Sequence, residues 1–286
     1  MNVIVKRRTH MKKILLINDL PGYGHVALSA MTPVLEAMEL ETFNLPTAVV
    51  SNTLDWGKFS ILATDEQIVK TIAVWDELGF EFDAVATGFI ANENQAEIIA
   101  DYCVKQSQKG VKIFADPIMG DEGKLYNSIT EKRITAMKKL VSVADYIVPN
   151  YTEAAALADR EYVYGAVSKE EMCAVAKKLN EMGAKNVVIT SANVEGSACT
   201  MGYDGEKGEF FFIPYEIIKG RFIGTGDIFS AFMAGYILKG ERMQTAVKKA
   251  MDAVKILIMH NLDNTDVNRG LIITKYLGEI LNGRQT

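Results

Sequence analysis

The stretch FIGTGDIFSAFMAGYIL, residues 222–238, places two glycines, a threonine and an aspartate ahead of an apolar run with helical spacing. Bare N–H groups at the start of a helix bind anions, and the helix dipole adds about half a positive charge there. The N–H groups of Thr225, Gly226 and Asp227 could therefore hold a phosphoryl group in transfer, with Asp227 accepting a proton from an attacking hydroxyl. Because glycine and aspartate also favour helix starts, a plain capped helix is an equal alternative for this tetrapeptide alone.

Two further motifs carry carboxylates without basic neighbours. They are DPIMGD, residues 116–121, and PNYTE, residues 149–153. If phosphates bind nearby, Asp116 and Glu153 are placed to organise Mg²⁺ through water, since this ion keeps much of its hydration shell. The alternative for Glu153 is a solvated residue in the first turn of a helix, where negative charge is favoured.

The remaining reactive residue types form no recognisable site. PGYGH, residues 21–25, is only a weak match to a dinucleotide fingerprint, because Ala27 stands where a third glycine is needed. His25 fits a turn better than a ligand, and the three histidines show no metal spacing. The three cysteines are an odd number at unrelated spacings, which favours a reducing cytoplasm over a disulfide framework or metal cluster.

Strands and helices must alternate to position these motifs. Short apolar runs predict strands, and longer runs with apolar residues on one face predict helices. The predicted strands are 12–19, 46–53, 82–90, 111–121, 144–150 and 185–191, and the predicted helices are 27–41, 66–79, 93–110, 131–142 and 168–183. Residues 194–220 resemble an antiparallel hairpin. The alternation predicts a mostly parallel sheet covered by helices on both faces.

Polar residues gather where six of the predicted strands end. They are Asn18 and Asp19; Ser51, Asn52 and Thr53; Thr87, Gly88 and Phe89; Asp116 and Asp121; Asn150 and Glu153; Thr190 and Ser191. In open parallel sheets ligands bind at the carboxyl ends of the strands. One polar strand end would mean little, but six on one edge indicate a binding site.

Composition narrows the class of protein. The 286 residues carry a net charge of −5 and no long run of lysine and arginine, which argues against a nucleic-acid partner. No apolar segment approaches the length of a membrane span, so we expect no membrane partner. With no linker or repeat visible, we expect one domain over residues 11–286, preceded by an extension over residues 1–10 if Met11 is the true start.

The order of several motifs is similar to that of a known family. GYGHVALSA, VVSNTLDWGKF, ATGF, DPIMGD, VPNYTEA, VITS and GTGDIFSAF follow one another as in the pyridoxal kinases of the ribokinase-like superfamily. The resemblance runs from Met11 to about residue 240. It implies a three-layer α/β/α sandwich around a mostly parallel sheet. It also implies a homodimer and ATP-dependent phosphorylation of the 5′-hydroxymethyl group of pyridoxal, pyridoxine or pyridoxamine, in salvage of pyridoxal 5′-phosphate.

The resemblance also implies roles for individual residues. Asp227 matches the catalytic base, and Gly224, Thr225 and Gly226 match its anion hole. The positions matching the nucleotide side are Asp116, Asp121, Tyr126, Asn150, Glu153, Thr190, Ser191, Thr225, Gly226 and Phe229. Among these, Asp116 and Glu153 match the Mg²⁺ site, and Asp116 and Thr190 lie where a monovalent cation such as K⁺ can bind. The positions matching the vitamer side are Asp19, Tyr23, Ser51, Thr53, Phe89 and Asp227.

Three positions depart from the family pattern. Asp19 replaces a common serine facing the pyridine nitrogen, and a carboxylate there favours a protonated ring. Ser51-Asn52-Thr53-Leu54 stands in place of SNHT, so the contact to the ring 3-hydroxyl moves to Thr53 or is lost. Val148 replaces a common threonine, which removes one oxygen from the monovalent-cation site.

Two alternatives to a pyridoxal kinase stay open. A hydroxymethylpyrimidine kinase phosphorylates a similar hydroxymethyl group, and Asp19 could pair with its aminopyrimidine ring. Such kinases match GYGH and SNT less well. A protein of the same fold that binds a vitamin or nucleotide without catalysis is the other, although the intact GTGD and NxxE motifs argue against it.

Overall fold

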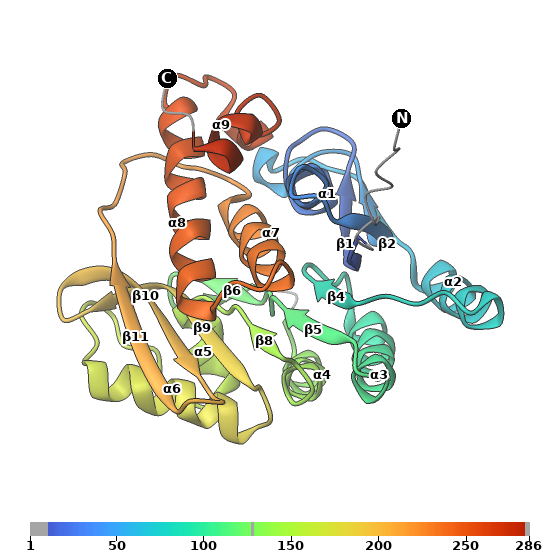
Figure 1. Ribbon diagram of the computed structural model, residues 1–286, viewed down its shortest axis with the longest axis horizontal. Coiled ribbons are helices and arrows are strands. Elements are labelled where there is room, and N and C mark those ends of the chain that lie inside the picture. Colours follow the sequence, from blue (N-terminus) through green and yellow to red (C-terminus); the bar gives the residue numbers. More distant parts are fainter. Residues whose placement is uncertain (1–10, 127–128, 284–286) are drawn as a thin grey trace, which may run out of the picture.

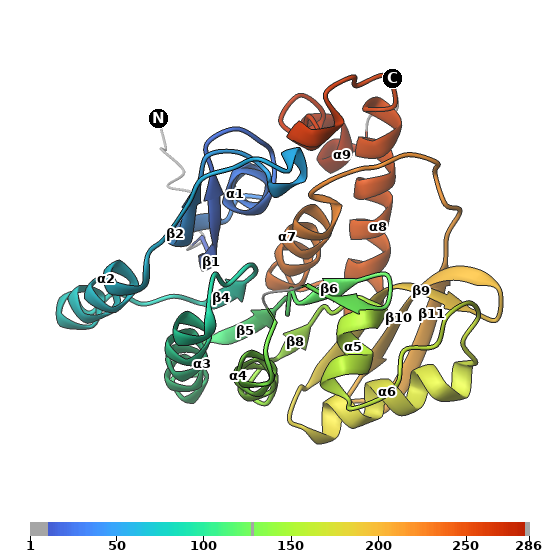
Figure 2. The ribbon, with the colours of Figure 1, turned by 180° about the vertical axis from the view of Figure 1, so that it is seen from behind.

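A nine-stranded sheet forms the centre of the molecule in the computed structural model, which describes residues 11–126 and 129–283 (Figures 1 and 2). The expected extension over residues 1–10 lies outside the described residues. In spatial order the strands are β11 (Glu209–Pro214), β10 (Ser197–Asp204), β9 (Asn186–Val194), β8 (Tyr146–Ile147), β5 (Lys112–Ala115), β4 (Ala84–Thr87), β1 (Lys13–Pro21), β2 (Glu41–Val50) and β3 (Ile61–Ala63). A separate small hairpin pairs β6 (Gly120–Asp121) with β7 (Lys124–Leu125).

The sheet is parallel from β2 through β9 and antiparallel at both edges. Strand β3 pairs antiparallel with β2, while β10 and β11 extend the other edge as an antiparallel ribbon. Strand β1 shows why the interior needs cover on both faces. Ile14 and Leu16 pack into the core on one side and Leu15 and Ile17 into the core on the other, all fully buried. A strand buried on both faces reads as a continuous apolar run.

Helices cover the two faces of the sheet. On one face lie α1 (Ala27–Ala37), α7 (Thr225–Leu238), α8 (Met243–His260) and α9 (Leu277–Asn282). The opposite side carries α2 (Asp65–Leu78), α3 (Glu93–Gln108), α4 (Glu131–Val141), α5 (Tyr151–Leu157) and α6 (Lys169–Glu181). The predicted three-layer α/β/α sandwich with a mostly parallel sheet is therefore confirmed.

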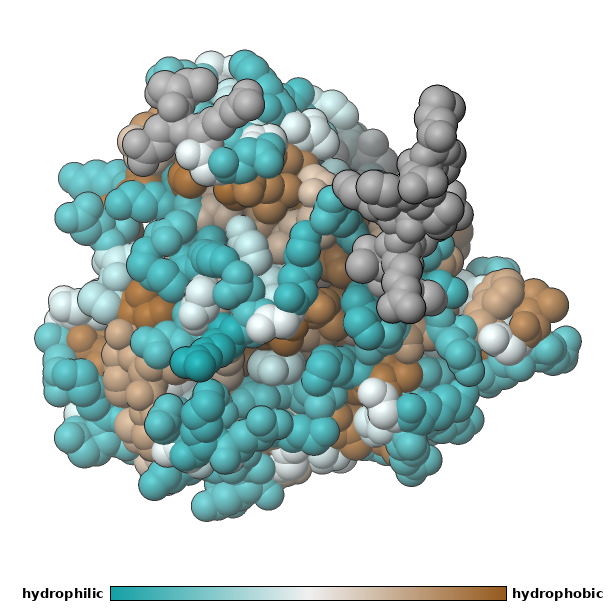
Figure 3. All heavy atoms as spheres, viewed as in Figure 1, coloured by the Kyte–Doolittle hydropathy of each residue, from teal (hydrophilic) through white to brown (hydrophobic). Residues whose placement is uncertain are grey.

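Hydrophilic side chains cover much of the face in Figure 3, and apolar ones gather at the end where Figure 1 places α2.

Several predicted boundaries were wrong. The helix predicted over 27–41 ends at Ala37, because Glu39 has a left-handed backbone (φ 62°) and β2 starts at Glu41. Strand β2 therefore begins five residues before its predicted start. The predicted strands 82–90 and 111–121 shrink to four residues each, because their polar ends form loops at the sheet edge. The short edge strand β3 and the helices α8 and α9 were not predicted.

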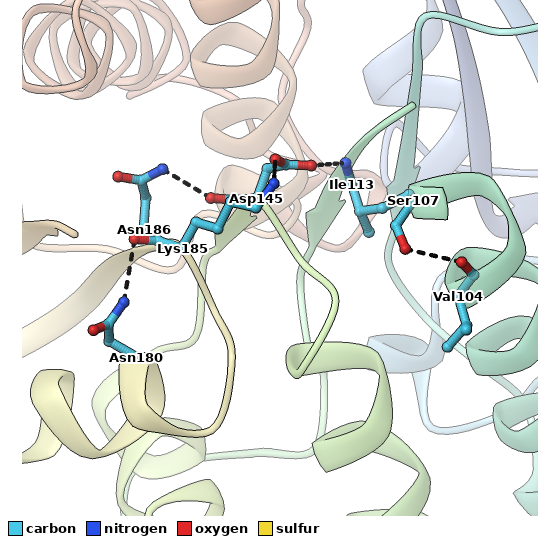
Figure 4. A network of polar contacts seen from close by, with 7 residues as sticks. All are labelled: Val104, Ser107, Ile113, Asp145, Asn180, Lys185 and Asn186. Atoms are coloured by element: carbon cyan, nitrogen blue, oxygen red, sulfur yellow. Dashed lines mark hydrogen bonds and ion pairs between the residues drawn. The ribbon is translucent and has the colours of Figure 1, made fainter. Parts of the chain in front are cut away.

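Asp145 ties together the strand ends opposite the polar edge. Its carboxylate accepts hydrogen bonds from the Ile113 N–H at 2.8 Å and the Lys185 ammonium at 2.8 Å, while its carbonyl accepts one from the Asn186 amide at 2.9 Å (Figure 4). Beside it, the Asn180 side chain donates to the backbone that enters β9. One buried side chain thus aligns β5, β8 and β9.

We expect Asp145→Ala to lower the free energy of unfolding by about 1–3 kcal/mol, because it leaves the buried Ile113 N–H without an acceptor. Urea unfolding followed by circular dichroism measures this change. Lys185→Ala is the matched control, since its side chain is 62% exposed and the ion pair alone is worth at most about 1 kcal/mol. Equal losses in the two variants would contradict this account.

Candidate functional site

The start of α7 lies beside the turn that leads into α1. Gly224 caps α7 in a left-handed conformation (φ 81°), and a Cβ there would come within 2.9 Å of the His25 carbonyl oxygen. Glycine is therefore needed for both the conformation and the close approach. The first N–H groups of α7 have no partner within the helix, and Thr225 and Gly226 line a cleft of about 1860 Å³. This geometry provides an anion site at the helix start.

Asp227 also lines this cleft, and both of its carboxylate oxygens are held. Oδ1 accepts a hydrogen bond from the Asn18 side-chain amide at 3.1 Å, and Oδ2 accepts one from the Ala27 N–H at 2.9 Å. Ala27 adopts a left-handed backbone (φ 48°), which costs a residue with a Cβ conformational energy. Loss of hydration raises the pKa of Asp227 above its usual range, and the two hydrogen bonds oppose that rise.

Two more carboxyl groups interact with Asp227. Burial, aided by the charge of Asp227, raises the pKa of Asp19 to about 7. The same two causes raise the pKa of Asp116 to about 7, while a hydrogen bond from the Ser230 hydroxyl at 3.0 Å opposes the rise. Carboxyl groups that share a site without a basic partner favour cations. Asp116 and Asp227 both line the cleft and therefore make its floor acidic.

Glu153 is a buried structural acid as well as a candidate ligand. Glu153 is 3% exposed, so the alternative of a solvated residue is wrong, although Glu153 does lie in the first turn of a helix. Its carboxylate accepts hydrogen bonds from the N–H groups of Met119, Gly120 and Asn150 at 2.9, 3.4 and 2.8 Å. Desolvation and the nearby Asp116 charge raise its pKa well above the usual range despite these bonds.

Asn150 completes a capping box with Glu153 at the start of α5. Its side-chain oxygen accepts from the Glu153 N–H at 3.0 Å, and its amide donates to the Gly120 carbonyl at 2.7 Å. The DPIMGD and PNYTE motifs are therefore one hydrogen-bonded unit.

In the described parts of the chain, no group of three or more His, Cys, Asp or Glu side chains is placed to hold a metal ion.

The cleft brings together every residue predicted for the nucleotide side. Its lining includes Asp116, Asp121, Tyr126, Asn150, Glu153, Thr190, Ser191, Thr225, Gly226 and Phe229. Sequence reasoning missed a further wall, which α8 provides through Lys248 and Lys255. The spacing of seven places both ammonium groups on the same side of the helix, and this is the signal that could have identified them.

The residues predicted for the vitamer side lie around the 21–25 turn and its neighbours. The Phe89 N–H donates to the Asn18 side-chain oxygen at 2.7 Å. The Ser51 hydroxyl donates to the Asn52 side chain at 2.6 Å, and the Thr53 hydroxyl donates to the Asn268 carbonyl. The roles predicted for these side chains stay predictions.

The chain's C-terminal part braces the same turn. The Tyr23 hydroxyl donates to Asp266 at 2.7 Å, and the His25 N–H donates to the Arg269 carbonyl at 2.7 Å. Gly270 packs so closely that a Cβ would lie 2.8 Å from the His25 carbonyl oxygen. Residues 266–270 therefore belong to the site, although nothing in their residue types indicated it.

Within the described residues, no helix combines the length and apolarity needed to cross a membrane.

Comparison with known proteins agrees with this geometry. Residues 32–272 match the family model described as phosphomethylpyrimidine kinase. A pyridoxal kinase of Sus scrofa is 27% identical, with 90% of this chain and 85% of that protein aligned. Four curated relatives, two named as pyridoxal kinases and two as "putative" pyridoxal kinases, are aligned with this chain over 59% to 86% of their own length.

Two solved structures are similar over nearly their whole length. A crystal structure from Bacteroides thetaiotaomicron, named as a "putative phosphomethylpyrimidine kinase", has 29% identity and a TM-score of 0.92, covering 98% of this chain and 96% of that one. A pyridoxal kinase from Leishmania donovani in complex with ADP and pyridoxine has 25% identity and a TM-score of 0.81, covering 94% and 95%. The chain belongs to the phosphomethylpyrimidine kinase family, and within it the chain is a kinase of the pyridoxal kinase type.

Proposed function

We propose that the chain transfers the γ-phosphoryl group of ATP to the 5′-hydroxymethyl group of pyridoxal, pyridoxine or pyridoxamine. The observation that carries the proposal is Asp227, a cleft carboxylate held at both oxygens directly beside the N–H groups that start α7. The complex of the Leishmania donovani kinase with ADP and pyridoxine supports the choice of both substrates.

Each part of the α7 start has a task in this reaction. Asp227 takes the proton from the attacking hydroxymethyl group, and its raised pKa makes it a stronger base than an ordinary carboxylate. The N–H groups of Thr225 and Gly226, next to the Gly224 cap, stabilise charge on the phosphoryl group as it moves. Because these donors are fixed by the helix, they need no rearrangement during the reaction.

The acidic floor of the cleft fits Mg²⁺. Asp116 has one carboxylate oxygen bonded to Ser230 and would hold the ion, whereas Glu153 would act through water because its oxygens already accept three backbone N–H groups. When bound, Mg²⁺ neutralises phosphate charge. A monovalent cation such as K⁺ would bind near Asp116 and Thr190, with Val148 supplying no side-chain oxygen.

The two substrates occupy neighbouring places. The nucleotide takes the wall with Asp121, Tyr126, Asn150, Thr190, Ser191 and Phe229. On α8, Lys255 adds positive charge to this wall, whereas Lys248 is paired with Asp252, which also lines the cleft. In this proposal the vitamer binds next to the cleft, beside Asp227. The residues predicted for it there are Asp19, Tyr23, Ser51, Thr53 and Phe89, none of which lines the cleft itself. Free cysteines at positions 103, 173 and 199 support a cytoplasmic location, where thiols stay reduced.

A hydroxymethylpyrimidine kinase is the second candidate. The description of the matched family model and the name of the Bacteroides thetaiotaomicron structure favour it, while a second structure of that protein contains pyridoxal. A comparison of kcat/KM on the three vitamers and on hydroxymethylpyrimidine separates the two. ATP consumption that depends on pyridoxal excludes a binding protein without catalysis.

The exposed edge of the sheet supports a homodimer. Every residue of β3 is exposed, including Ile61 at 43% and Leu62 at 68%, and the strand ends the sheet. An apolar edge strand presents unpaired backbone groups to a second chain. We propose that two copies of the protein associate through β3.

We expect Asp227→Asn to lower kcat with pyridoxal by about 10²–10⁴-fold, because asparagine accepts no proton at neutral pH. Helix capping plays no part, since Gly224 is the cap of α7 and the Asp227 side chain does not cap the helix. Asparagine keeps only one of the two oxygens that accept from the Asn18 amide and the Ala27 N–H, so the temperature of thermal unfolding should fall. ATP should still bind, because the backbone donors are unchanged. Steady-state kinetics on the folded variant measure the effect. A near-wild-type kcat would show that Asp227 is not the base.

We expect Asp19→Ala to raise the KM for the vitamer about ten- to a hundredfold and to leave the KM for ATP unchanged, since one charge-assisted hydrogen bond is lost. With a pKa of about 7, Asp19 gains a proton as pH falls, so the wild-type vitamer KM should rise from pH 8 to pH 6. Asp19→Asn should flatten that rise. An unchanged KM and slope would mean that Asp19 points elsewhere.

We expect Leu62→Lys to convert a dimer into a monomer, because two lysines would be buried at the paired edge. Light scattering coupled to size exclusion measures the mass. Leu262→Lys is the control, because Leu262 is 47% exposed and lies outside β3. A wild-type protein that is monomeric, or a dimer that survives Leu62→Lys, would overturn the proposal.

A further inference from the structure

Asn18, at the carboxyl end of the apolar part of β1, connects the two halves of the site. It is 1% exposed. Its amide nitrogen donates to the Asp227 carboxylate at 3.1 Å, and its side-chain oxygen accepts from the N–H groups of Phe89 at 2.7 Å and Asp19 at 3.0 Å. One side chain therefore contacts the proposed base and the segment that carries the proposed aromatic wall.

Only one orientation of this amide satisfies its neighbours. If nitrogen and oxygen were exchanged, the oxygen would face the Asp227 carboxylate and the NH₂ group would face two N–H donors. The nitrogen also contacts the Met31 sulfur at 3.5 Å, and sulfur is a weak acceptor. The environment thus fixes the direction in which the amide donates, toward Asp227.

The neighbouring glycine preserves this arrangement. A Cβ on Gly88 would lie 2.2 Å from the Asn18 amide nitrogen and 2.8 Å from its oxygen, so the amide would have to move. Gly88 has no positive φ that would by itself require glycine. The glycine in the ATGF motif therefore leaves room for the Asn18 side chain.

We infer that Asn18 is a positioning residue that sets the orientation of Asp227 through its amide nitrogen and the placement of the Phe89 segment through its oxygen. The inference rests on the proposed function, in which Asp227 is the base and Phe89 borders the vitamer. The Ala27 N–H holds the other oxygen of Asp227, so loss of the Asn18 contact frees the carboxylate to rotate about one remaining bond.

The two ends of the amide are tested by two substitutions. Asn18→Ala removes both contacts, so kcat should fall about ten- to a hundredfold and the vitamer KM should rise several-fold, with the KM for ATP within about twofold. Asn18→Asp keeps an oxygen for the Phe89 N–H but replaces the donor to Asp227. It should lower kcat and leave the vitamer KM within about threefold of wild type. A merely structural role would not separate kcat from KM in this way.

Coupling to the base gives a second readout. If Asn18 acts through Asp227, then Asn18→Ala should change kcat by less than about twofold in an Asp227→Asn background. Asn186→Ala is the matched control, because Asn186 is also a buried asparagine, but it starts β9 and bonds the Asp145 carbonyl, whereas the cleft residues Thr190 and Ser191 lie further along that strand. It should lower stability without lowering kcat. If the Asn18 variants do not fold, Gly88→Ala should lower kcat while Asn18 is retained.

The outcomes separate this inference from the proposed function. A folded Asn18→Ala enzyme with kcat within about twofold of wild type, or with its full loss retained in the Asp227→Asn background, overturns the positioning role. An Asp227→Asn enzyme with wild-type turnover instead overturns the base assignment. A slow Asp227→Asn enzyme combined with an unaffected Asn18→Ala enzyme leaves the proposed function standing and removes only the role of Asn18.

Discussion

The site depends on the contact between the N-termini of two helices that are 200 residues apart in sequence. Gly224 lets α7 begin against the His25–Val26 backbone, and the Ala27 N–H at the start of α1 then reaches the Asp227 carboxylate. Two positive helix ends converge on one acid, which stabilises its charged form against the cost of burial. This contact restricts two positions. Position 224 must be glycine, and Ala27 must adopt a left-handed backbone.

The acids around this contact show how function and stability compete. Asp19, Asp116 and Glu153 all have raised pKa values, chiefly because they lose hydration. Apolar side chains of similar volume would give the fold a larger free energy of unfolding than these buried acids do. Cations that bind to the acids can offset this loss of stability. Asp145, at the opposite end of the strands, pairs its carboxylate with a lysine and a backbone N–H and so links neighbouring strands.

Local sequence predicted the fold because each parallel strand is a short apolar run and each long helix has one apolar face. Of the six strand ends predicted to form a site, those after β5, β8 and β9 line the cleft, since parallel strands end at a common edge. Local sequence could not predict that Glu153 is buried, because its three donors come from loops whose shape depends on tertiary packing. The same limit applies to Asn18, whose partners Phe89 and Asp227 lie 71 and 209 residues away.

The brace formed by residues 266–270 has a consequence for synthesis of the protein. Tyr23, His25 and Thr53 each bond to this segment, so the turn beside α1 lacks three partners until the last part of the chain is available. Domains fold as their chains emerge from the ribosome, N-terminal part first. A nascent chain that stops before residue 266 already holds every strand of the sheet from β1 to β11, but the turn beside α1 takes its final shape only after residues 266–270 have been made.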